Sequence, residues 1–129
     1  MRKFLLGLFL TGSLVSNAQE LPKGYAQLIK EVEAPMIQWR RHFHEFPELS
    51  NRETNTGKYI AEFLKTLPNV EVRYPVAKTG VVAVLKGGKP GSTIALRADI
   101  DALPVLERTP VPFASKVTSE YNGQKVGVM

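Results

Sequence analysis

The chain has 129 residues, of which 43% are hydrophobic and none is cysteine, a length that suits one domain with a modest core. Its formal net charge of +5 comes from basic residues scattered among acidic ones, without a basic stripe or a stacking motif, so we expect no nucleic-acid partner. The absence of cysteine excludes a disulfide framework and a lipid-anchored lipoprotein.

Residues 1–18 predict a secretory signal peptide. A basic start precedes an apolar run over residues 4–15, and Ser16 and Ala18 place small residues before a cut ahead of Gln19. A membrane anchor is the competing interpretation, but the run is about a dozen residues and a spanning helix needs roughly 20. We therefore expect export through a cleaved signal peptide, to the periplasm or outside the cell, and no stable membrane anchor.

Two helices are expected next. Between residues 24 and 46, apolar side chains recur near the helical period, with a bend or a restart at Pro35. A second amphipathic stripe covers residues 56–67. Before it, the sequence Ser50-Asn51-Arg52-Glu53 has the form of a capping box, in which the Ser50 hydroxyl accepts from the Glu53 backbone N–H and the Glu53 carboxylate reaches back.

Beyond the second helix the apolar period changes from helical to alternating. Residues 70–74 predict a strand with one wet face, and residues 81–85 predict a strand that is apolar on both faces and therefore central in a sheet. Residues 86–91 form a turn, and residues 93–98 are expected to form a third strand that pairs with the second as a hairpin. Residues 101–129 are broken by proline and glycine and show no long periodic run.

This order predicts an α/β fold, with two helices followed by strands of a mixed sheet. The two helices can cover one face of the sheet, but a strand that is apolar on both faces needs cover on the other face as well. Residues 101–129 offer little to supply that cover. The pattern therefore indicates an incomplete piece of a larger α/β domain.

The stretch ALRADIDALPV ends an apolar run in Arg97, Asp99 and Asp101, which point to one face if the third strand continues. At the carboxyl end of a strand in an open α/β sheet, such carboxylates can hold a metal-bound histidine, orient a water or bind a hard cation. The alternative is a solvated ion pair between Arg97 and one aspartate, contributing about 0–1 kcal/mol. The spacing alone favours this alternative.

The two histidines, His42 and His44, do not have the spacing of a metal site. On a helix they point about 200° apart, whereas metal-binding pairs are spaced four apart. A capping or a buried, hydrogen-bonded role is expected instead. Residues 87–91 also lack the spacing of a phosphate-binding loop, and Ser92 and Ser115 lack the surroundings of a nucleophile elbow.

An ordered set of motifs runs through the chain: WRRHFHEFPELS at 39–50, Glu53 with Thr54, KTGVVA at 78–83, GGKPG at 87–91, IALRADIDALP at 94–104 and PFAS at 112–115. Together these motifs resemble the M20 metallopeptidase family, in its amidohydrolase branch of N-acyl-amino-acid amidohydrolases and hippurate hydrolases. The resemblance implies that residues 19–129 are the N-terminal portion of a zinc-peptidase-like catalytic domain.

The resemblance also implies a chemistry. Such enzymes hydrolyse the amide bond of N-acyl amino acids or peptide-like conjugates with two divalent metal ions, Zn, Mn or similar. Asp101 matches the family aspartate that orients a metal-binding histidine, and Asp99 stands where the wider family has that histidine. Asp101 and Asp99 are therefore the candidate catalytic residues, in a supporting role. The metal ligands and an inserted dimerisation domain are expected beyond Met129.

For the 129-residue chain alone, this implies no bound metal and no activity. We also expect no stable fold, because its central strand would be left uncovered. Two alternatives to the amidohydrolase remain open. The whole protein could be an M20 dipeptidase or carboxypeptidase, since most of the specificity pocket lies outside this sequence. The short chain could instead be an exported remnant without catalysis. A homodimer is compatible with the whole protein.

Overall fold

The structure is a computed structural model that describes residues 22–129. The predicted signal peptide lies outside the described residues. The chain divides into two compact units, which separate between Val32 and Glu33. Among the described residues, no helix has the length and apolar character needed to cross a membrane.

Helix α1 spans Tyr25–Glu45. It runs without interruption through Pro35, so the helix does not restart there, and the alternative of a bend stays a prediction. Proline removes one intrahelical hydrogen bond and disfavours the helix locally, but the amphipathic pattern continues on both sides. The helix ends just before Pro47, as predicted, and the Phe46 N–H donates to the His42 carbonyl at 3.0 Å.

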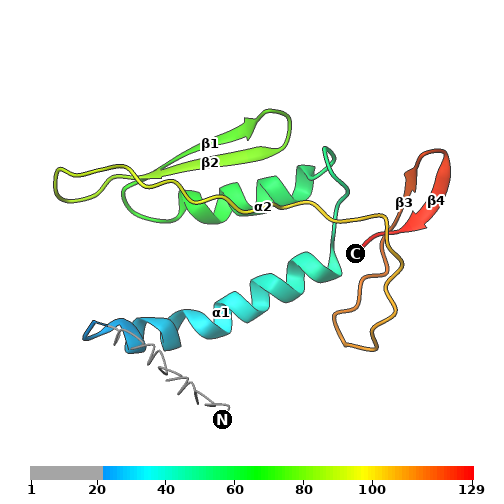
Figure 1. Cartoon of the computed structure of the whole chain (residues 1–129), viewed down its shortest axis with the longest axis horizontal. Helices are drawn as coiled ribbons and strands as arrows, with labels where there is room; N and C mark the ends of the chain where they lie inside the picture. Colours follow the sequence, from blue (N-terminus) through cyan, green and yellow to red (C-terminus); the bar gives the residue numbers. More distant parts are fainter. Residues whose placement is uncertain (1–21) are drawn as a thin grey trace, which may run out of the picture. The chain divides into compact units, whose positions relative to one another are not determined.

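Helix α2 spans Thr54–Lys65, which confirms the second predicted helix but moves both of its ends two residues earlier. It packs against the hairpin that follows, formed by β1 (Val70–Val76) and β2 (Gly80–Leu85) (Figure 1). The two strands are antiparallel, with Val70 opposite Leu85. Side chains along β1 alternate between exposed and half-buried, as the sequence pattern predicts.

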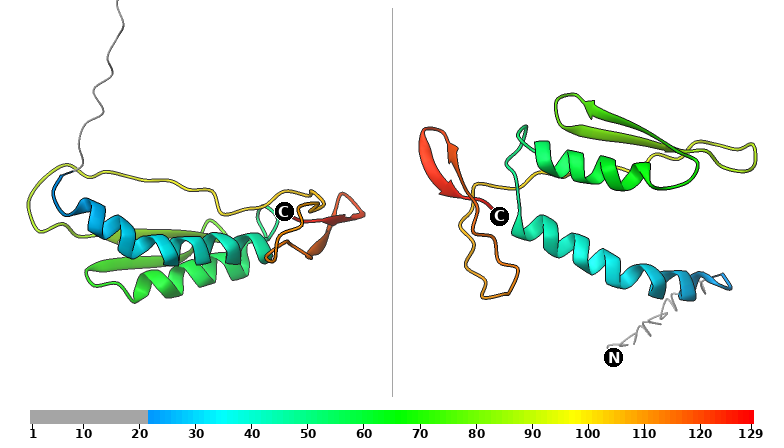
Figure 2. Two further views of the ribbon diagram at one scale, coloured as in Figure 1. Left: turned by 90° about the horizontal axis from the view of Figure 1, so that it is seen from below. Right: turned by 180° about the vertical axis from the view of Figure 1, so that it is seen from behind.

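The predicted third strand is wrong in this structure. Residues 93–98 form no strand, and their apolar side chains face solvent, with Ile94 84% and Leu96 96% exposed. A strand exists only where another backbone pairs with it, and within residues 22–129 β2 pairs with β1 alone, so β2 is not central here. Residues 86–117 connect β2 to the last hairpin of the chain, and Figure 2 draws them as a long irregular segment.

A second hairpin, which sequence analysis missed, closes the described chain. It consists of β3 (Thr118–Tyr121) and β4 (Gln124–Gly127), paired antiparallel. The turn between them has positive φ angles of 52° at Asn122 and 73° at Gly123. Asn-Gly is the preferred pair for this two-residue turn, so the signal was present in the sequence.

The most buried apolar side chains come from three separate segments. Leu49 is 4% exposed, Ala61 is 1% exposed and Val128 is 1% exposed. Leu49 forms a parallel bridge with Ala102, and Met129, which follows Val128, exchanges two backbone hydrogen bonds with Leu103. The predicted order of two helices followed by strands is confirmed, but the described strands form two separate hairpins in place of one mixed sheet.

Candidate functional site

The acidic motif, residues 95–105, lies on the extended connection between β2 and β3. Arg97 Nη2 contacts Asp99 Oδ1 at 2.8 Å, and the two side chains are 89% and 71% exposed. This is the solvated ion pair that the spacing favoured, and pairs of this kind contribute about 0–1 kcal/mol. Asp101 is exposed as well. The supporting catalytic role of Asp99 and Asp101 stays a prediction.

The backbone just after Asp101 is held on two sides. The Ala102 N–H donates to the Glu48 carbonyl at 2.8 Å, and Ala102 forms an isolated parallel bridge with Leu49. Leu103 exchanges two backbone hydrogen bonds with Met129, at 2.9 and 3.1 Å. The backbone directly after the exposed Asp101 is therefore fixed at Ala102 and Leu103.

A cleft of about 470 Å³ lies beside the acidic motif. Asp99 and Asp101 line it from the connection, and Arg40 lines it from α1. The rest of the lining is mostly apolar and consists of Met36, Trp39, Phe43, Pro47, Thr56, Ile60, Ala98, Ile100 and Ala102. Carboxylates next to an apolar cleft are a common arrangement in small-molecule sites.

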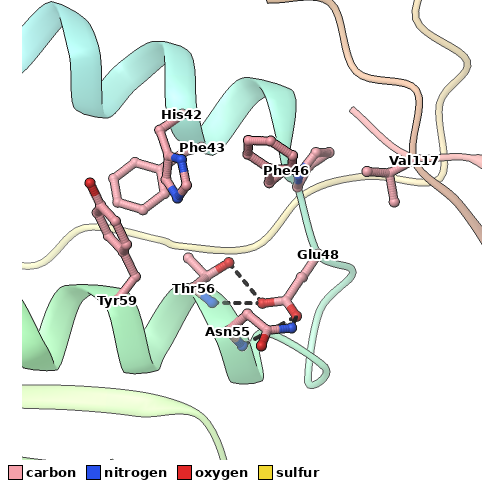
Figure 3. A pocket seen from close by; sticks show the side chains of 9 residues that line it. His42, Phe43, Phe46, Glu48, Asn55, Thr56, Tyr59 and Val117 are labelled. Atoms are coloured by element: carbon pink, nitrogen blue, oxygen red, sulfur yellow. Dashed lines mark hydrogen bonds between the residues drawn. The ribbon is translucent and has the colours of Figure 1, made fainter.

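Glu48 closes the N-terminus of α2 (Figure 3). Its Oε2 accepts from the Thr56 backbone N–H at 2.7 Å and from the Thr56 hydroxyl at 2.8 Å. Its Oε1 accepts from the Asn55 backbone N–H at 3.2 Å and from the Asn55 side-chain amide at 2.8 Å. Partial burial would raise the pKa of the Glu48 carboxyl, but these hydrogen bonds outweigh it and lower the pKa below its ordinary value.

The predicted capping box is therefore wrong. Ser50 lies four residues before the first residue of α2, and the cap position is Glu53, whose side chain does not bond to the helix N–H groups. The Glu53 carboxylate does accept from the Asn51 backbone N–H at 2.9 Å, which is close to the reach-back that the motif predicts. The chain makes a turn with a positive φ of 63° at Asn51, and this turn brings Glu48 to the helix end in place of Ser50.

Glu53 instead joins α2 to the first hairpin. It is 6% exposed, and its Oε2 accepts from the Thr79 hydroxyl at 2.7 Å. The Tyr74 hydroxyl donates to the Thr54 carbonyl at 2.8 Å across the same contact. Burial would raise the pKa of Glu53, but the hydrogen bonds from Thr79 and from nearby backbone N–H groups lower it overall.

The two histidines have different surroundings. His42 stacks on Tyr59, with ring centroids 4.3 Å apart, and lines an aromatic cleft of about 480 Å³ (Figure 3). His44 Nε2 lies 2.5 Å from Glu107 Oε2, so the expected hydrogen-bonded role is found for this residue. Hydrogen bonds from Thr109, together with His44, lower the pKa of Glu107 to about 2.

A metal centre cannot be built from the described side chains alone. Within residues 22–129, no three His, Cys, Asp or Glu side chains gather closely enough to hold a metal ion. Asp99 already pairs with Arg97, and the histidines are engaged by Tyr59 and Glu107. We therefore derive no catalytic step through a metal from these residues.

The role of Glu48 is the main feature of this site that sequence analysis missed. A carboxylate that caps a helix starting six residues later fits no local capping motif, because the intervening turn decides whether it can reach the N–H groups. The only sequence signal was the position of Glu48 inside the motif WRRHFHEFPELS.

Comparison with known proteins identifies relatives of this chain. No family model matches it. It is 53% identical over 90 residues to thermostable carboxypeptidase 1 of Saccharolobus solfataricus, which covers 69% of this chain and 23% of the relative. It is 44% identical over 90 residues to an N-acyl-L-amino acid amidohydrolase of Geobacillus stearothermophilus, covering 70% of this chain and 24% of the relative.

A solved structure of a peptidase is also similar to this chain. The YXEP protein of Bacillus subtilis, described as a dinuclear metal binding peptidase of the M20 family, is 44% identical with a TM-score of 0.64. The match covers 78% of this chain and 26% of that protein. The chain thus spans about a quarter of the length of the relatives it matches.

Proposed function

We propose, from the chain's membership of the M20 amidohydrolases and carboxypeptidases, that the protein translated from its whole reading frame hydrolyses the amide bond of N-acyl amino acids. The observation that carries this proposal is the 44% identity to an N-acyl-L-amino acid amidohydrolase, with the matching region spread over 70% of this chain. That translation product is the whole protein.

Two divalent metal ions, Zn, Mn or similar, belong to this proposal as cofactors. The description of the YXEP protein as dinuclear metal binding supports them. Such ions supply an activated water for attack on an amide carbonyl. Within residues 22–129, no three His, Cys, Asp or Glu side chains gather closely enough to hold such an ion, so the proposal requires ligands from outside these residues to complete the site.

In the proposed enzyme, Asp101 and Asp99 support the active site without binding metal. Asp101 is exposed and stands next to a fixed backbone point, a combination that suits a carboxylate that orients a neighbouring group. Asp99 is held by Arg97. The apolar cleft beside them would suit the acyl part of a substrate.

The decisive experiment is a hydrolysis assay of the whole protein loaded with Zn²⁺ or Mn²⁺. We expect release of free amino acid from N-acetyl amino acids, and a loss of about 10- to 100-fold in kcat for Asp101→Asn, the usual effect of removing a residue that orients a metal ligand. Glu120→Gln, on the exposed second hairpin, is the matched control and should leave kcat unchanged. An unaltered kcat in Asp101→Asn would refute the role of Asp101.

A carboxypeptidase or dipeptidase is the second candidate, favoured by the 53% identity to thermostable carboxypeptidase 1. Parallel assays with dipeptides and N-acetyl amino acids separate the two, because kcat/KM compares the substrates directly. An exported remnant without catalysis predicts no metal-dependent hydrolysis of either substrate. The 129-residue chain tested alone should release no amino acid.

Export is a further part of the proposal. The composition of residues 1–18 supports a cleaved leader. N-terminal sequencing of the mature protein should therefore begin at Gln19, and Ala18→Trp should block processing, because a small residue is needed before the cut. A mature protein that retains Met1 would contradict this.

A further inference from the structure

We propose that Glu48 is a positioning residue for Asp101. This inference rests on the proposed function, in which Asp101 supports the active site. The single residue Glu48 contacts α2 through its side chain and the acidic motif through its backbone. Figure 3 shows its carboxylate directed at the first turn of α2.

The side-chain contact fixes Glu48 relative to α2. The first N–H groups of a helix have no partner inside the helix, and here the Glu48 carboxylate accepts from those of Asn55 and Thr56. Both residues add a second bond from their side chains. A carboxylate is also favoured at this end of a helix by the helix dipole. With four hydrogen bonds, the side chain has little freedom to move away from α2.

The backbone contact fixes the acidic motif relative to Glu48. The Glu48 carbonyl accepts from the N–H of Ala102, the residue directly after Asp101, at 2.8 Å. The next residue, Leu49, bridges to Ala102 in parallel and is 4% exposed. Because Leu49 is buried, this contact is held by packing as well as by hydrogen bonds. The position of Asp101 is thus connected to α2 through Glu48.

The Asp101 side chain depends on this anchorage because its neighbours give it little support. The Arg97 guanidinium bonds to Asp99, and Asp101 itself is exposed. A carboxylate that orients another group must be held within about 0.5 Å of its working position. Here that precision comes from the backbone at Ala102 and Leu103.

A second contact, independent of Glu48, also holds the acidic motif, and it limits the expected effect of a Glu48 variant. Leu103 is bonded to Met129 through two backbone hydrogen bonds, and the preceding Val128 is 1% exposed. Loss of the Glu48 side chain should therefore loosen the acidic motif without releasing it. The expected defect is a misplaced Asp101 in a folded protein.

Hydrogen exchange of the whole protein tests the anchorage directly. In Glu48→Ala we expect the amides of both Thr56 and Ala102 to exchange about tenfold faster. Glu48→Gln, which keeps an acceptor for Thr56, should restore most of the protection of Ala102 and covers the case in which Glu48→Ala does not fold. The matched control is Tyr74→Phe, which loses the bond to the Thr54 carbonyl at the same end of α2 and should leave Ala102 unchanged.

Kinetics supply the second measurement. Glu48→Ala should lower kcat by about tenfold with little change in KM, since a misplaced Asp101 affects the reaction more than substrate binding. Faster exchange at Thr56 with an unchanged Ala102 would show that Glu48 only caps α2, and would overturn the inference. If the wild-type protein hydrolyses neither substrate class, the proposed function fails, while the exchange of Ala102 still decides whether Glu48 holds the motif.

Discussion

The loop that precedes α2 and the connection that carries the acidic motif differ in how far their residues are buried and hydrogen-bonded. Loop residues Leu49 and Glu53 are 4% and 6% exposed, and two carboxylates there take up hydrogen bonds from the helix and the hairpin. In the connection, Ile94 and Leu96 are 84% and 96% exposed. The contrast teaches that irregular backbone can be well anchored while a strand-like sequence stays without a partner.

The physical reason lies in the range of the interactions. A helix end and its loop find their partners within a few residues, as Glu48 does with Thr56. A strand needs another backbone along its whole length, and residues 93–98 form no strand in the described chain. The backbone is held beyond them, at Ala102 by the loop before α2 and at Leu103 by Met129. The variants below test the two regions, beginning with the largest expected effect.

Gly57→Ala should destabilise the whole protein by about 3 kcal/mol. A Cβ at this position would collide with the Thr79 carbonyl oxygen and would lie 2.8 Å from Cε2 of Tyr74, so α2 and the hairpin would have to move apart. Helix propensity alone predicts a gain of about 1 kcal/mol, so the sign is diagnostic. Urea denaturation measures it, with Gly88→Ala as the control because nothing lies within 4 Å of that site. A stabilised Gly57→Ala protein would mean that α2 and Thr79 are not in contact.

Leu96→Ala should cost the whole protein about 2 kcal/mol, the lower range for a buried leucine. The alternating sequence at 93–98 indicates a strand that is buried once the rest of the α/β domain pairs with it. A side chain that stays exposed in the whole protein would instead give an effect within about 0.5 kcal/mol. Thermal melting of the whole protein measures the change, and Lys89→Ala is the neutral control. A small effect of Leu96→Ala would show that this segment is a connection in the whole protein too.

Patterns with local causes were predicted well from the sequence. Both helices and the alternating strand at Val70–Val76 follow from the spacing of their apolar residues. Pro47 correctly marked the end of α1. Asn122-Gly123 carried an equally local hairpin signal, which was overlooked because the surrounding residues show no long apolar period.

Features that depend on distant partners were predicted less well. The prediction of a third strand was wrong, because residues far from 93–98 decide whether that segment finds a partner strand. The prediction of a capping box was wrong, because the turn at Asn51 decides which side-chain oxygen reaches the Thr56 N–H. The spacing of Ser50 and Glu53 does not decide it. For the site, spacing alone left Arg97, Asp99 and Asp101 as an ion pair or a functional group, and the structure shows the pair without excluding the function.

Acid should destabilise the whole protein in part through Glu53, in the loop before α2. The pKa of Glu53 is lowered in the folded protein, so its contribution is present above the unfolded pKa of about 4.3 and is lost as the pH falls through the folded pKa. Glu53→Gln should lower stability at pH 7 by about 1–2 kcal/mol, because hydrogen bonds to a charged acceptor weaken, and should flatten the acid dependence. Melting temperatures of the two whole proteins between pH 7 and pH 3 measure both effects. Parallel pH curves would show that Glu53 does not contribute to the acid sensitivity; Glu62→Gln, on the exposed face of α2, is the control.

Gly123→Ala should have the smallest effect, a loss of about 1 kcal/mol, because the φ angle of 73° favours glycine over alanine. The change should stay within the β3–β4 hairpin, where nothing lies within 4 Å of the new Cβ. Amide exchange should therefore accelerate at Tyr121 and Gln124 and stay unchanged at Ala102. Gly91→Ala, equally open but without a positive φ, is the matched control. If Ala102 also loses protection in Gly123→Ala, the hairpin supports the acidic motif through Val128 and Met129, and this second contact is as important as Glu48.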